Sequence, residues 1–432
     1  MNYVRKPGFL IAAPSSGSGK TVITLGLLRA FRNKGLKVVS AKAGPDYIDP
    51  AFHKAATGEE CVNLDPWAMN ASNLGSLSQN FFAEADIALV EGMMGLFDGA
   101  ADGSGSAADL AVSLGLPVVL VVDASRMSFS VSALVRGFRD HRPDLNLAGV
   151  ILNRVGSSRH EIMLRKALAD LDVTVFGAVP KLDDLELPSR HLGLVQASEH
   201  DGLEIFITHA ADHIAAHCDL ETLGNLGWEV EASEAVYELP PLGQRIAIAQ
   251  DEAFAFCYPH ILSAWRNSGA ELSFFSPLHD QAPEDGVDAV YLPGGYPELH
   301  ADRIANASGF IGGLTTARDW GVAIYGECGG YMVLGEGLVD AEGQRHSMAG
   351  LLKLETSFEK RKLHLGYRRL KADNFPLGEA FTAHEFHYTS ATKEEGQPLF
   401  EAQDALGNAL GNVGLREGSV MGSYMHVIDK VG

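Results

Sequence analysis

The first half of the chain alternates short apolar runs with longer amphipathic stretches. The apolar runs are too short for buried helices and are rich in β-branched residues, so they predict buried strands. Each run is followed by enough residues for a crossover helix, and strands that are apolar throughout are typical of parallel sheets covered on both faces. The pattern therefore predicts a doubly wound parallel sheet. The six runs cover residues 8–14, 36–43, 86–92, 117–125, 147–155 and 175–180.

A second alternation of the same kind follows a break in the pattern. Residues 228–243 are acidic and end near Pro240-Pro241, which is typical of a linker. We therefore predict two α/β domains, at residues 1–227 and 244–432, joined by residues 228–243. In the second domain, the tail from Leu351 shows a stronger strand pattern than the residues before it. Its earlier apolar runs cover residues 245–250, 271–277, 288–295 and 321–327.

Composition narrows the classes of function. A chain of 432 residues with 46% hydrophobic residues can bury two large cores. Its formal charge of −21 argues against nucleic acid and against an anionic membrane as partners. No apolar run is long enough to span a bilayer, and Pro14 and its neighbouring serines interrupt the first one too early for a secretion signal. We expect a soluble, cytoplasmic protein.

A phosphate-binding loop follows the first predicted strand. The sequence APSSGSGKT precedes an apolar helical stretch, and the backbone N–H groups of such a loop can surround phosphate oxygens. The strict motif has glycine where Pro14 stands, and Ser15 and Ser16 occupy the place where partition ATPases carry a further lysine. We predict that ATP is bound by Ser16, Gly17, Ser18, Gly19, Lys20 and Thr21.

Acidic residues follow two other predicted strands, at the sheet edge where open α/β sheets bind ligands. Magnesium prefers hard oxygen ligands and shares them with phosphates, so Thr21, Asp46 and Glu91 form the predicted Mg²⁺ site. Asp49 and Asp98 lie near these residues in sequence and are expected to face the second substrate, although each alone could be a solvated turn residue. Asn153, after another apolar run, is expected to contact the base of ATP.

Cys328 stands in a setting unlike that of the other three cysteines. It follows the apolar run 321–327 within GECGGYM, and three glycines surround it. A cysteine among small residues between a strand and a helix predicts a nucleophile elbow, and the helix N-terminus should favour the thiolate. Cys61, Cys218 and Cys257 show no CxxC spacing and are interpreted as ordinary buried cysteines.

A nucleophilic cysteine also needs an oxyanion hole and a base. Gly294 and Gly295, after a predicted strand, are the candidates for the oxyanion hole. His426 is the preferred base, with His384 and His387 as alternatives.

Seven segments together resemble one family, the cobyrinic and hydrogenobyrinic acid a,c-diamide synthases. They are APSSGSGKT, KAGPDYIDPAFH, EGMMGLFDG, LPGGYPELH, GECGGYM, TAHEFHY and GSYMH, and they occur in order over nearly the whole chain. The resemblance implies an N-terminal synthetase domain similar to dethiobiotin synthetase and a C-terminal class I glutamine amidotransferase domain. It places the nucleophile at Cys328 and its partner at His426. The Glu that other class I enzymes carry two residues after this histidine is Ile428 here, with Asp429 next, so the third member of the triad stays open.

The resemblance also implies the reaction. ATP with Mg²⁺ would activate the c and then the a carboxylate of a corrin-type macrocycle as acyl phosphates, and glutamine would supply ammonia. Arg190 is a candidate to pair with substrate carboxylates, against the alternative of an ordinary loop residue, and a homodimer is an option. Three interpretations stay open: the metal-free macrocycle, which we prefer, its cobalt-containing counterpart, and a P-loop ATPase switch that would not need Cys328.

Overall fold

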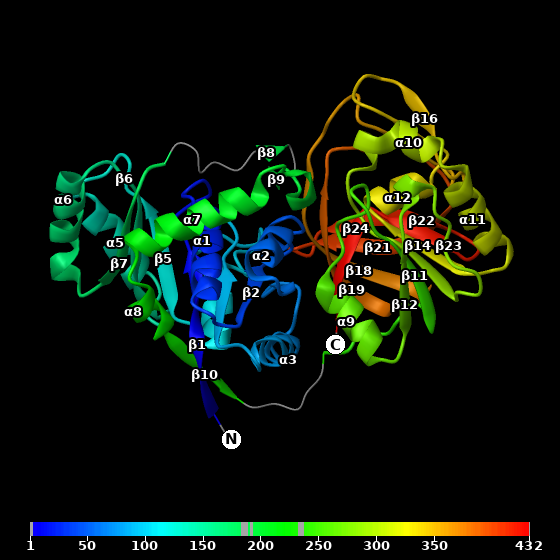
Figure 1. Ribbon diagram of the computed structural model, residues 1–432. Helices are drawn as coiled ribbons and strands as arrows, with labels where there is room; N and C mark the ends of the chain where they lie inside the picture. Colours follow the sequence, from blue (N-terminus) through cyan, green and yellow to red (C-terminus); the bar gives the residue numbers. More distant parts are fainter. Residues whose placement is uncertain (1–2, 183–188, 191–192, 232–236, 432) are drawn as a thin grey trace. The chain divides into compact units, whose positions relative to one another are not determined.

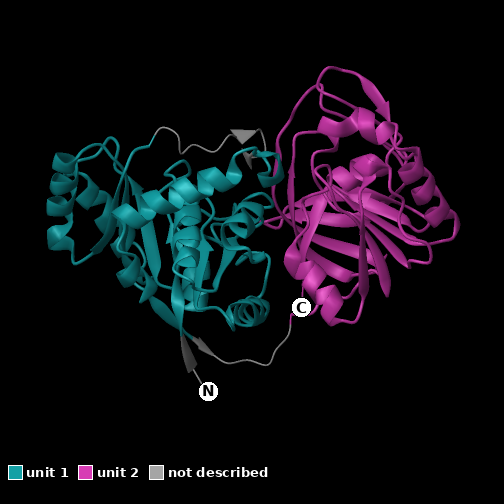
Figure 2. Ribbon diagram, viewed as in Figure 1, with its two compact units in different colours: residues 1–236 teal, residues 237–432 magenta. Residues whose placement is uncertain are grey.

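The chain folds into two compact units, described here from a computed structural model. Unit 1 comprises Met1–Val236 and unit 2 comprises Tyr237–Gly432 (Figure 2). The structure describes residues 3–182, 189–190, 193–231 and 237–431.

Unit 1 is built on a sheet with the strand order β3-β2-β4-β1-β5-β6-β7, in which neighbouring strands are parallel (Figure 1). This confirms the parallel sheet predicted from the apolar runs. The sequence pattern missed β3, which has only four residues, and β10, which pairs antiparallel with the start of β1. The strands are β1 (Tyr3–Ala12), β2 (Val38–Ala43), β3 (Cys61–Leu64), β4 (Ile87–Glu91), β5 (Val118–Asp123), β6 (Leu147–Val155), β7 (Thr174–Pro180), the separate pair β8 (Ser189–Arg190) and β9 (Gly193–Leu194), and β10 (Gly227–Glu231).

Helices connect these strands, and the connection between β1 and β2 carries the phosphate loop. Helix α1 packs beside α7, and a side chain at Gly26 of α1 would collide with Ile214 of α7, its Cβ lying 2.5 Å from Ile214 Cγ1. The helices are α1 (Lys20–Asn33), α2 (Asp49–Thr57), α3 (Ala71–Phe82), α4 (Ala107–Leu114), α5 (Val131–Asp140), α6 (Ser158–Leu168), α7 (Leu203–His217) and α8 (Leu220–Gly224), with short 3₁₀ turns at Ala169–Leu171 and Ala197–Glu199.

The segment expected as a linker, residues 228–243, begins inside a strand. Trp228 lies on β10, and its ring packs edge-on against Phe82 of α3 with ring centroids 5.8 Å apart. Residues 232–236 lie outside the described part. Tyr237 is buried within unit 2, where its hydroxyl donates a hydrogen bond to Asp429 Oδ1 (3.2 Å). The chain is therefore held by unit 1 up to β10 and by unit 2 from Tyr237 onward.

Unit 2 contains a mixed sheet of the order β12-β11-β13-β14-β23-β22-β21-β18-β19-β24. The pairs from β12 to β23 are parallel and the rest are antiparallel. The strands are β11 (Arg245–Ala249), β12 (Glu271–Phe275), β13 (Ala289–Leu292), β14 (Ala323–Glu327), β18 (His364–Phe375), β19 (Gly378–His387), β21 (Gln397–Asp404), β22 (Ala409–Glu417), β23 (Val420–Ser423) and β24 (Met425–Lys430).

A smaller sheet in unit 2 has the order β16-β15-β17-β20. It consists of β15 (Gly337–Val339), β16 (Arg345–Ser347), β17 (Leu354–Ser357) and β20 (Ser390–Glu394). The helices of the unit are α9 (Pro259–Asn267), α10 (Ala301–Ala305), α11 (Ser308–Asp319) and α12 (Gly329–Leu334), with 3₁₀ turns at Pro277–His279 and Pro297–His300.

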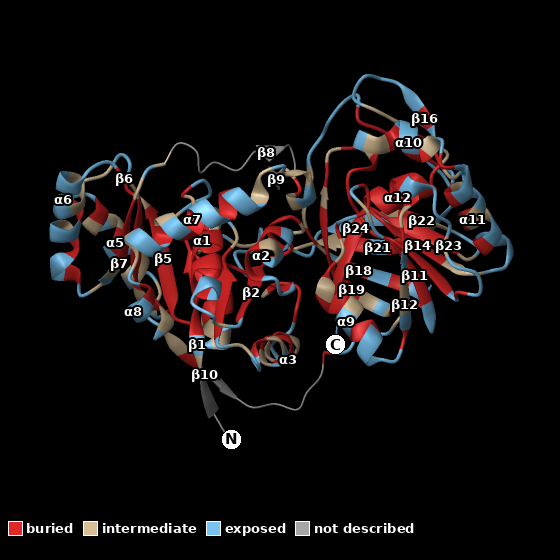
Figure 3. Cartoon of the chain, viewed as in Figure 1, coloured by how far each residue is buried: buried red, intermediate tan, exposed pale blue. Residues whose placement is uncertain are grey.

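Several strands of both sheets are buried along their length (Figure 3). Every residue of β2, β3, β4 and β13 is buried, as expected for strands covered on both faces. None of the helices in the described ranges is both long and apolar enough to cross a membrane. The carboxyl ends of β1, β2 and β4 in unit 1 and of β14 in unit 2 carry the polar residues considered next.

Candidate active sites

The predicted phosphate loop lies between β1 and α1. Gly17 and Gly19 have φ angles of 80° and 88°, a conformation that suits glycine and lets the loop turn into the helix. Lys20, the first residue of α1, is buried and donates a hydrogen bond from Nζ to the Met94 carbonyl oxygen (2.6 Å). Burial lowers its pKa. The ammonium is thus held beside the loop, which suits a group that neutralises phosphate.

Glu91, at the end of β4, joins three residues of unit 1. Its Oε1 accepts hydrogen bonds from Thr21 Oγ1 (2.8 Å) and Lys42 Nζ (3.0 Å), and its Oε2 accepts one from His53 Nε2 (2.8 Å). Burial alone would raise the pKa of Glu91, but Lys42 and His53 outweigh it and hold the pKa below its usual range. A fully buried carboxylate is therefore kept ionised next to the phosphate loop.

Lys42, at the end of β2, gathers the acidic residues of the predicted metal and substrate sites. Its Nζ forms a short ion pair with Asp49 and lies 3.8 Å from Asp46 Oδ2. Burial and Asp46 raise the pKa of Asp49 to about 6, although Lys42 opposes them. The structure therefore brings Asp46, Asp49, Glu91 and Thr21 together, as the sequence predicts, and adds a lysine at their centre.

Lys42 and His53 are site residues that sequence reasoning missed. Lys42 stands at the carboxyl end of a fully buried strand, which is the signal that also pointed to Glu91. His53 is fully buried in α2 and contacts Cys61 Sγ through Nδ1 (3.4 Å). Burial would lower its pKa, but Cys61 and Glu91 raise it to about 10.

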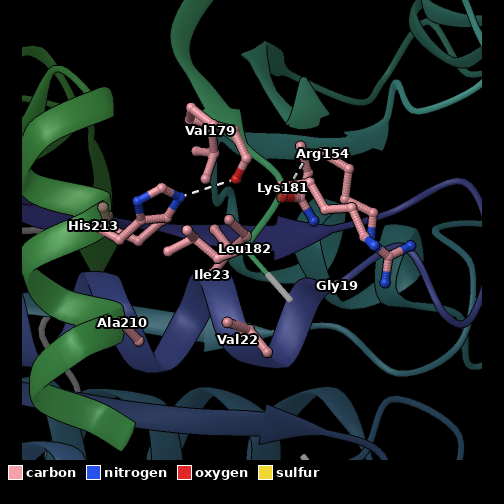
Figure 4. A pocket seen from close by; sticks show the side chains of 12 residues that line it. Gly19, Val22, Ile23, Arg154, Val179, Lys181, Leu182, Ala210 and His213 are labelled. Atoms are coloured by element: carbon pink, nitrogen blue, oxygen red, sulfur yellow. Dashed lines mark hydrogen bonds between the residues drawn. The ribbon is translucent and has the colours of Figure 1, made fainter. Parts of the chain in front are cut away.

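Asn153 and Arg154, at the end of β6, hold the phosphate loop from its other side. Asn153 Nδ2 donates to the Ser18 carbonyl oxygen (2.9 Å), and Arg154 donates to the Gly17 carbonyl oxygen (2.9 Å). These residues, with the start of α1, the end of β7 and α7, line an open pocket (Figure 4). His213 of α7 also lines it and bonds the Pro180 carbonyl oxygen through Nε2 (2.9 Å).

The remaining predicted substrate residues of unit 1 are Asp98, whose charge acts on Lys20, and Arg190. Asp98 accepts a hydrogen bond at Oδ2 from the backbone N–H of Gly95 (2.9 Å), so it closes the loop after β4. A Cβ at Gly95 would lie 2.5 Å from that same oxygen and 2.8 Å from the Pro14 carbonyl oxygen, which shows how tightly this loop packs on the phosphate loop. Arg190 is in β8, and its side chain is outside the described part.

In unit 2, Cys328 forms the sharp turn between β14 and α12. Its φ and ψ are 46° and −104°, a strained backbone for a residue with a side chain. The glycines around it have no room for side chains. A Cβ would lie 2.8 Å from the Gly330 backbone at Gly326, 2.8 Å from the Pro297 ring at Gly329, and 2.0 Å from the Leu292 carbonyl oxygen at Gly330. Close packing therefore sets the turn that presents the thiol.

His426 of β24 lies next to this turn. Gly294 lies between the two residues, and the space there is too small for a side chain on it. A Cβ at Gly294 would lie 2.3 Å from His426 Cε1, 3.1 Å from His426 Nε2 and 3.3 Å from Cys328 Cβ. The neighbouring Gly295 N would lie 3.0 Å from a Cβ at Gly329. The structure thus places the predicted nucleophile, base and oxyanion-hole glycines side by side.

Burial keeps this pair uncharged at rest. It raises the pKa of Cys328 well above its usual range, and Glu298 adds to the effect, while the backbone N–H of Gly329 opposes it. Burial, with His384 and His387 nearby, lowers the pKa of His426 to about 3. The thiolate expected from the helix N-terminus is therefore not the resting form, because loss of solvent outweighs the dipole of a helix of six residues. A thiol facing a neutral imidazole needs proton transfer at the moment of attack.

The alternative bases on β19 have other surroundings. His384 stands opposite His426 in the antiparallel pairing of β19 and β24. The ring nitrogens of His387 face Glu385 Oε1 (3.0 Å) and the Thr389 carbonyl oxygen (3.1 Å), and its ring stacks on Tyr424 with centroids 4.0 Å apart. Both nitrogens of His387 are thus committed. His426 stays our candidate base because it borders Gly294, which also lies against Cys328.

Glu327, which directly precedes the nucleophile, is a further residue that sequence reasoning missed. It is buried, and its Oε2 lies 3.8 Å from His426 Nδ1. Oε2 accepts a hydrogen bond from Tyr291 (2.7 Å), and Oε1 accepts from Tyr325 (3.0 Å) and from the backbone N–H of Val427 (3.1 Å). The signal in the sequence was an acidic residue ending an apolar strand.

Comparisons with known proteins match both units. Residues 9–195 match the family model of the CobQ/CobB/MinD/ParA nucleotide binding domain. Residues 245–430 match the family model of the CobB/CobQ-like glutamine amidotransferase domain. A glutamine amidotransferase of known structure from Thermotoga maritima matches 42% of this chain and 75% of its own length, with 12% identity and a TM-score of 0.30.

Full-length relatives are far more similar. The hydrogenobyrinate a,c-diamide synthase of Brucella anthropi is 57% identical over 431 residues, covering 98% of this chain and 99% of that protein. The protein of the same name from Rhizobium meliloti is 56% identical, with the same coverage. That of Rhodobacter capsulatus is 50% identical over 98% of both chains.

Proposed function

The chain belongs to the hydrogenobyrinate a,c-diamide synthase family, and from this premise we propose that it amidates the a and c carboxylates of hydrogenobyrinic acid, using ATP and glutamine. The observation that carries the proposal is the identity of 57% along essentially the whole of a relative so named. The two sites match the needs of this reaction. One can activate a carboxylate, and the other can release ammonia from glutamine.

In unit 1, the γ-phosphoryl group of ATP would pass to a substrate carboxylate. The carboxylate oxygen forms a bond to phosphorus, ADP leaves, and the resulting acyl phosphate is open to attack by ammonia, which expels phosphate. Lys20 beside the loop and Lys42 at the centre of the acidic cluster are placed to neutralise the charge of the transferred group. Asp49, ion-paired to Lys42, would hold that lysine near the carboxylate to be activated.

Glu91 and the residues near it offer the type of ligand atom that magnesium prefers. The Thr21 hydroxyl and a Glu91 carboxylate oxygen meet at the loop, and both are hard oxygen ligands, with Asp46 nearby. Bound there, the ion would neutralise charge on the phosphates of ATP. Asn153 and the pocket of Figure 4 are proposed to receive the base of ATP, because that pocket begins at Gly19 of the phosphate loop.

In unit 2, Cys328 Sγ would attack the side-chain carbonyl carbon of glutamine. His426 takes the thiol proton and delivers it to the departing nitrogen, so ammonia leaves and a glutamyl thioester remains. Water then hydrolyses the thioester, and the thiol is restored. The backbone N–H groups of Gly294 and Gly295 are proposed to hold the oxyanion, since this loop lies against the Cys328 turn.

Mass spectrometry of the product tests the proposal. The protein is incubated with ATP, Mg²⁺ and either glutamine or ammonium, and with either hydrogenobyrinic acid or its cobalt-containing counterpart. We expect a diamide of the metal-free macrocycle. Cys328→Ala should lose synthesis from glutamine and keep synthesis from ammonium, because only the first needs the thiol. Cys218→Ala, which removes a cysteine that belongs to neither site, is the matched control and should keep both.

Three results would contradict the proposal. A diamide formed only from the cobalt macrocycle would reassign the substrate. Glutamine-dependent synthesis that survives in Cys328→Ala would remove the thiol from the mechanism. ATP hydrolysis with no amidated product from either macrocycle would favour a nucleotide switch.

A further inference from the structure

Glutamine hydrolysis by a cysteine and a histidine usually involves a third group that orients the histidine. The sequence carries Ile428 two residues after His426, and the next residue, Asp429, points elsewhere. Asp429 Oδ1 accepts hydrogen bonds from Tyr237 (3.2 Å) and from the backbone N–H of Lys430 (2.8 Å). Asp429 therefore serves the contact with Tyr237.

We propose that Glu327 is the residue that positions His426 and stabilises its protonated form during glutamine hydrolysis. This inference rests on the proposed function and concerns the same site. Glu327 Oε2 lies 3.8 Å from His426 Nδ1. The ring atoms Cε1 and Nε2 border Gly294, and a Cβ added at Gly294 would also lie 3.3 Å from Cys328 Cβ. Nδ1 is thus the ring nitrogen nearer the carboxylate, and Cys328 Cβ lies across Gly294 from the Cε1 and Nε2 atoms of the ring.

The backbone explains how a residue beside the nucleophile reaches the base. Glu327 ends β14, which is parallel to β23, and Glu327 pairs with Ser423 in that register. The chain returns from Ser423 into β24 within two residues, so His426 and Val427 come back to the end of β14. There the Val427 N–H donates to Glu327 Oε1 (3.1 Å). One carboxylate thereby ties the strand of the nucleophile to the strand of the base.

The environment of Glu327 suits a charge that is needed only briefly. Tyr291 and Tyr325 donate hydrogen bonds to it, and both it and His426 are fully buried. Burial raises the pKa of Glu327 to about 7, against the hydrogen bonds from Tyr291, Val427 and Tyr325. A buried carboxylate gains most from a cation that forms beside it, and His426 becomes such a cation when it takes the thiol proton.

The pH response depends on every titratable group that faces this pair. Around Glu327 these are Tyr291 of β13, Tyr325 of β14 and Cys257 of the segment before α9. Around His426 they are His384 and His387 of β19, together with Cys328. The Cys328 thiol itself is faced by Glu298 of the 3₁₀ turn Pro297–His300, by Glu385 of β19 and by Glu327. Removing the negative charge of Glu327 makes the imidazolium less stable. The thiol should then lose its proton only at higher pH.

The test compares wild type, Glu327→Gln, and Asp429→Asn as a matched control that neutralises another buried acid of unit 2. Three quantities are measured: glutaminase kcat and KM, ammonium-dependent amidation, and the rate at which the chloroketone analogue of glutamine alkylates Cys328 as a function of pH. For Glu327→Gln we expect kcat to fall about 10- to 1000-fold with KM within about threefold. The alkylation profile should move up by about one pH unit or more. Ammonium-dependent amidation should persist.

Asp429→Asn should keep the alkylation profile of the wild type. Wild-type kcat and profile in Glu327→Gln, or the loss of both in Asp429→Asn alone, would overturn the inference. If wild type itself hydrolysed no glutamine, the proposed function would fail instead, so the two failures are distinguishable. Should Glu327→Gln not fold, Glu327→Asp shortens the side chain and keeps its charge. A wild-type kcat in that folded variant would equally overturn the role of Glu327.

Discussion

Replacing Glu91 by glutamine tests whether the buried network of unit 1 is held by charge. The carboxylate accepts hydrogen bonds from Thr21, Lys42 and His53 and is fully buried. Glutamine keeps the size and one acceptor oxygen but removes the charge. Lys42 retains its ion pair with Asp49, whereas His53 loses its charged partner.

The magnitude follows from these contacts. Breaking a buried ion pair by removing one partner costs about 3–5 kcal/mol. We expect the lower end, about 3 kcal/mol, because Lys42 keeps Asp49. For a unit of this size, 1 kcal/mol corresponds to about 2–4 °C in Tm, so the melting temperature of unit 1 should fall by about 6–12 °C.

Differential scanning calorimetry at neutral pH measures this, because it can separate the transitions of the two units. The control is Glu84→Gln, which breaks an ion pair with Lys37 (3.1 Å) at a glutamate whose side chain is 86% exposed. Exposed pairs contribute at most about 1 kcal/mol, so this variant should melt within about 4 °C of wild type. A shift in Glu91→Gln no larger than that of the control would refute the argument.

In Glu91→Gln, we also expect the Tm of unit 1 to depend differently on pH. The pKa of His53 is about 10 in the folded protein and 6.5 ordinarily, so its stabilisation is complete below 6.5 and is lost as pH rises through about 10. The pKa of Glu91 is lowered from 4.5, so its stabilisation is present above 4.5 and is lost in acid. The Tm of unit 1 should therefore fall between pH 7 and pH 10 more steeply in wild type than in Glu91→Gln. Parallel curves would contradict this.

Two further variants separate the sites. Gly294→Ala would place a methyl group 2.3 Å from His426 Cε1. Glutamine-dependent synthesis should therefore fall at least about tenfold while ammonium-dependent synthesis persists. Equal losses of both activities would count against the proposed place of this glycine. Lys20→Gln should abolish ATP hydrolysis and amidation, because the Lys20 ammonium acts on the phosphates of ATP. Glutaminase activity, measured by the release of glutamate, should remain. ATP turnover at the wild-type rate would exclude that role of Lys20.

The parallel sheet of unit 1 could be predicted because its strands are buried on both faces and appear as continuous apolar runs. β3 escaped prediction because Cys61–Leu64 is too short to show a period, and its burial depends on packing beside β2. β10 escaped because its role comes from a partner far away in sequence, the start of β1. An acidic segment such as 228–243 gives no local sign of that pairing.

The candidate residues fall into the same two groups. Gly17 and Gly19 could be found because their left-handed backbone conformation favours glycine. Cys328 could be found because the glycines around it mark a tightly packed turn. Lys42 and His53 could not be placed by spacing, because their roles depend on the meeting of β2, α2 and β4 at Glu91. The protonation state of Cys328 was expected wrongly for a similar reason, since a local motif shows the helix but not the burial.

Glu327 shows most clearly why a triad is a matter of geometry. A search by spacing looks after the histidine, because one strand can carry the base and its acid two residues apart on the same face. Here that position holds Ile428, and the acid arrives from β14 instead, at the residue before the nucleophile. The substitution is physically equivalent if the carboxylate reaches Nδ1 while the thiol stays near the opposite edge of the ring. An acid on the nucleophile's own strand also adds a constraint. Any shift of β14 that moves Cys328 moves the carboxylate with it, so the nucleophile and the residue that positions its base keep their relative placement.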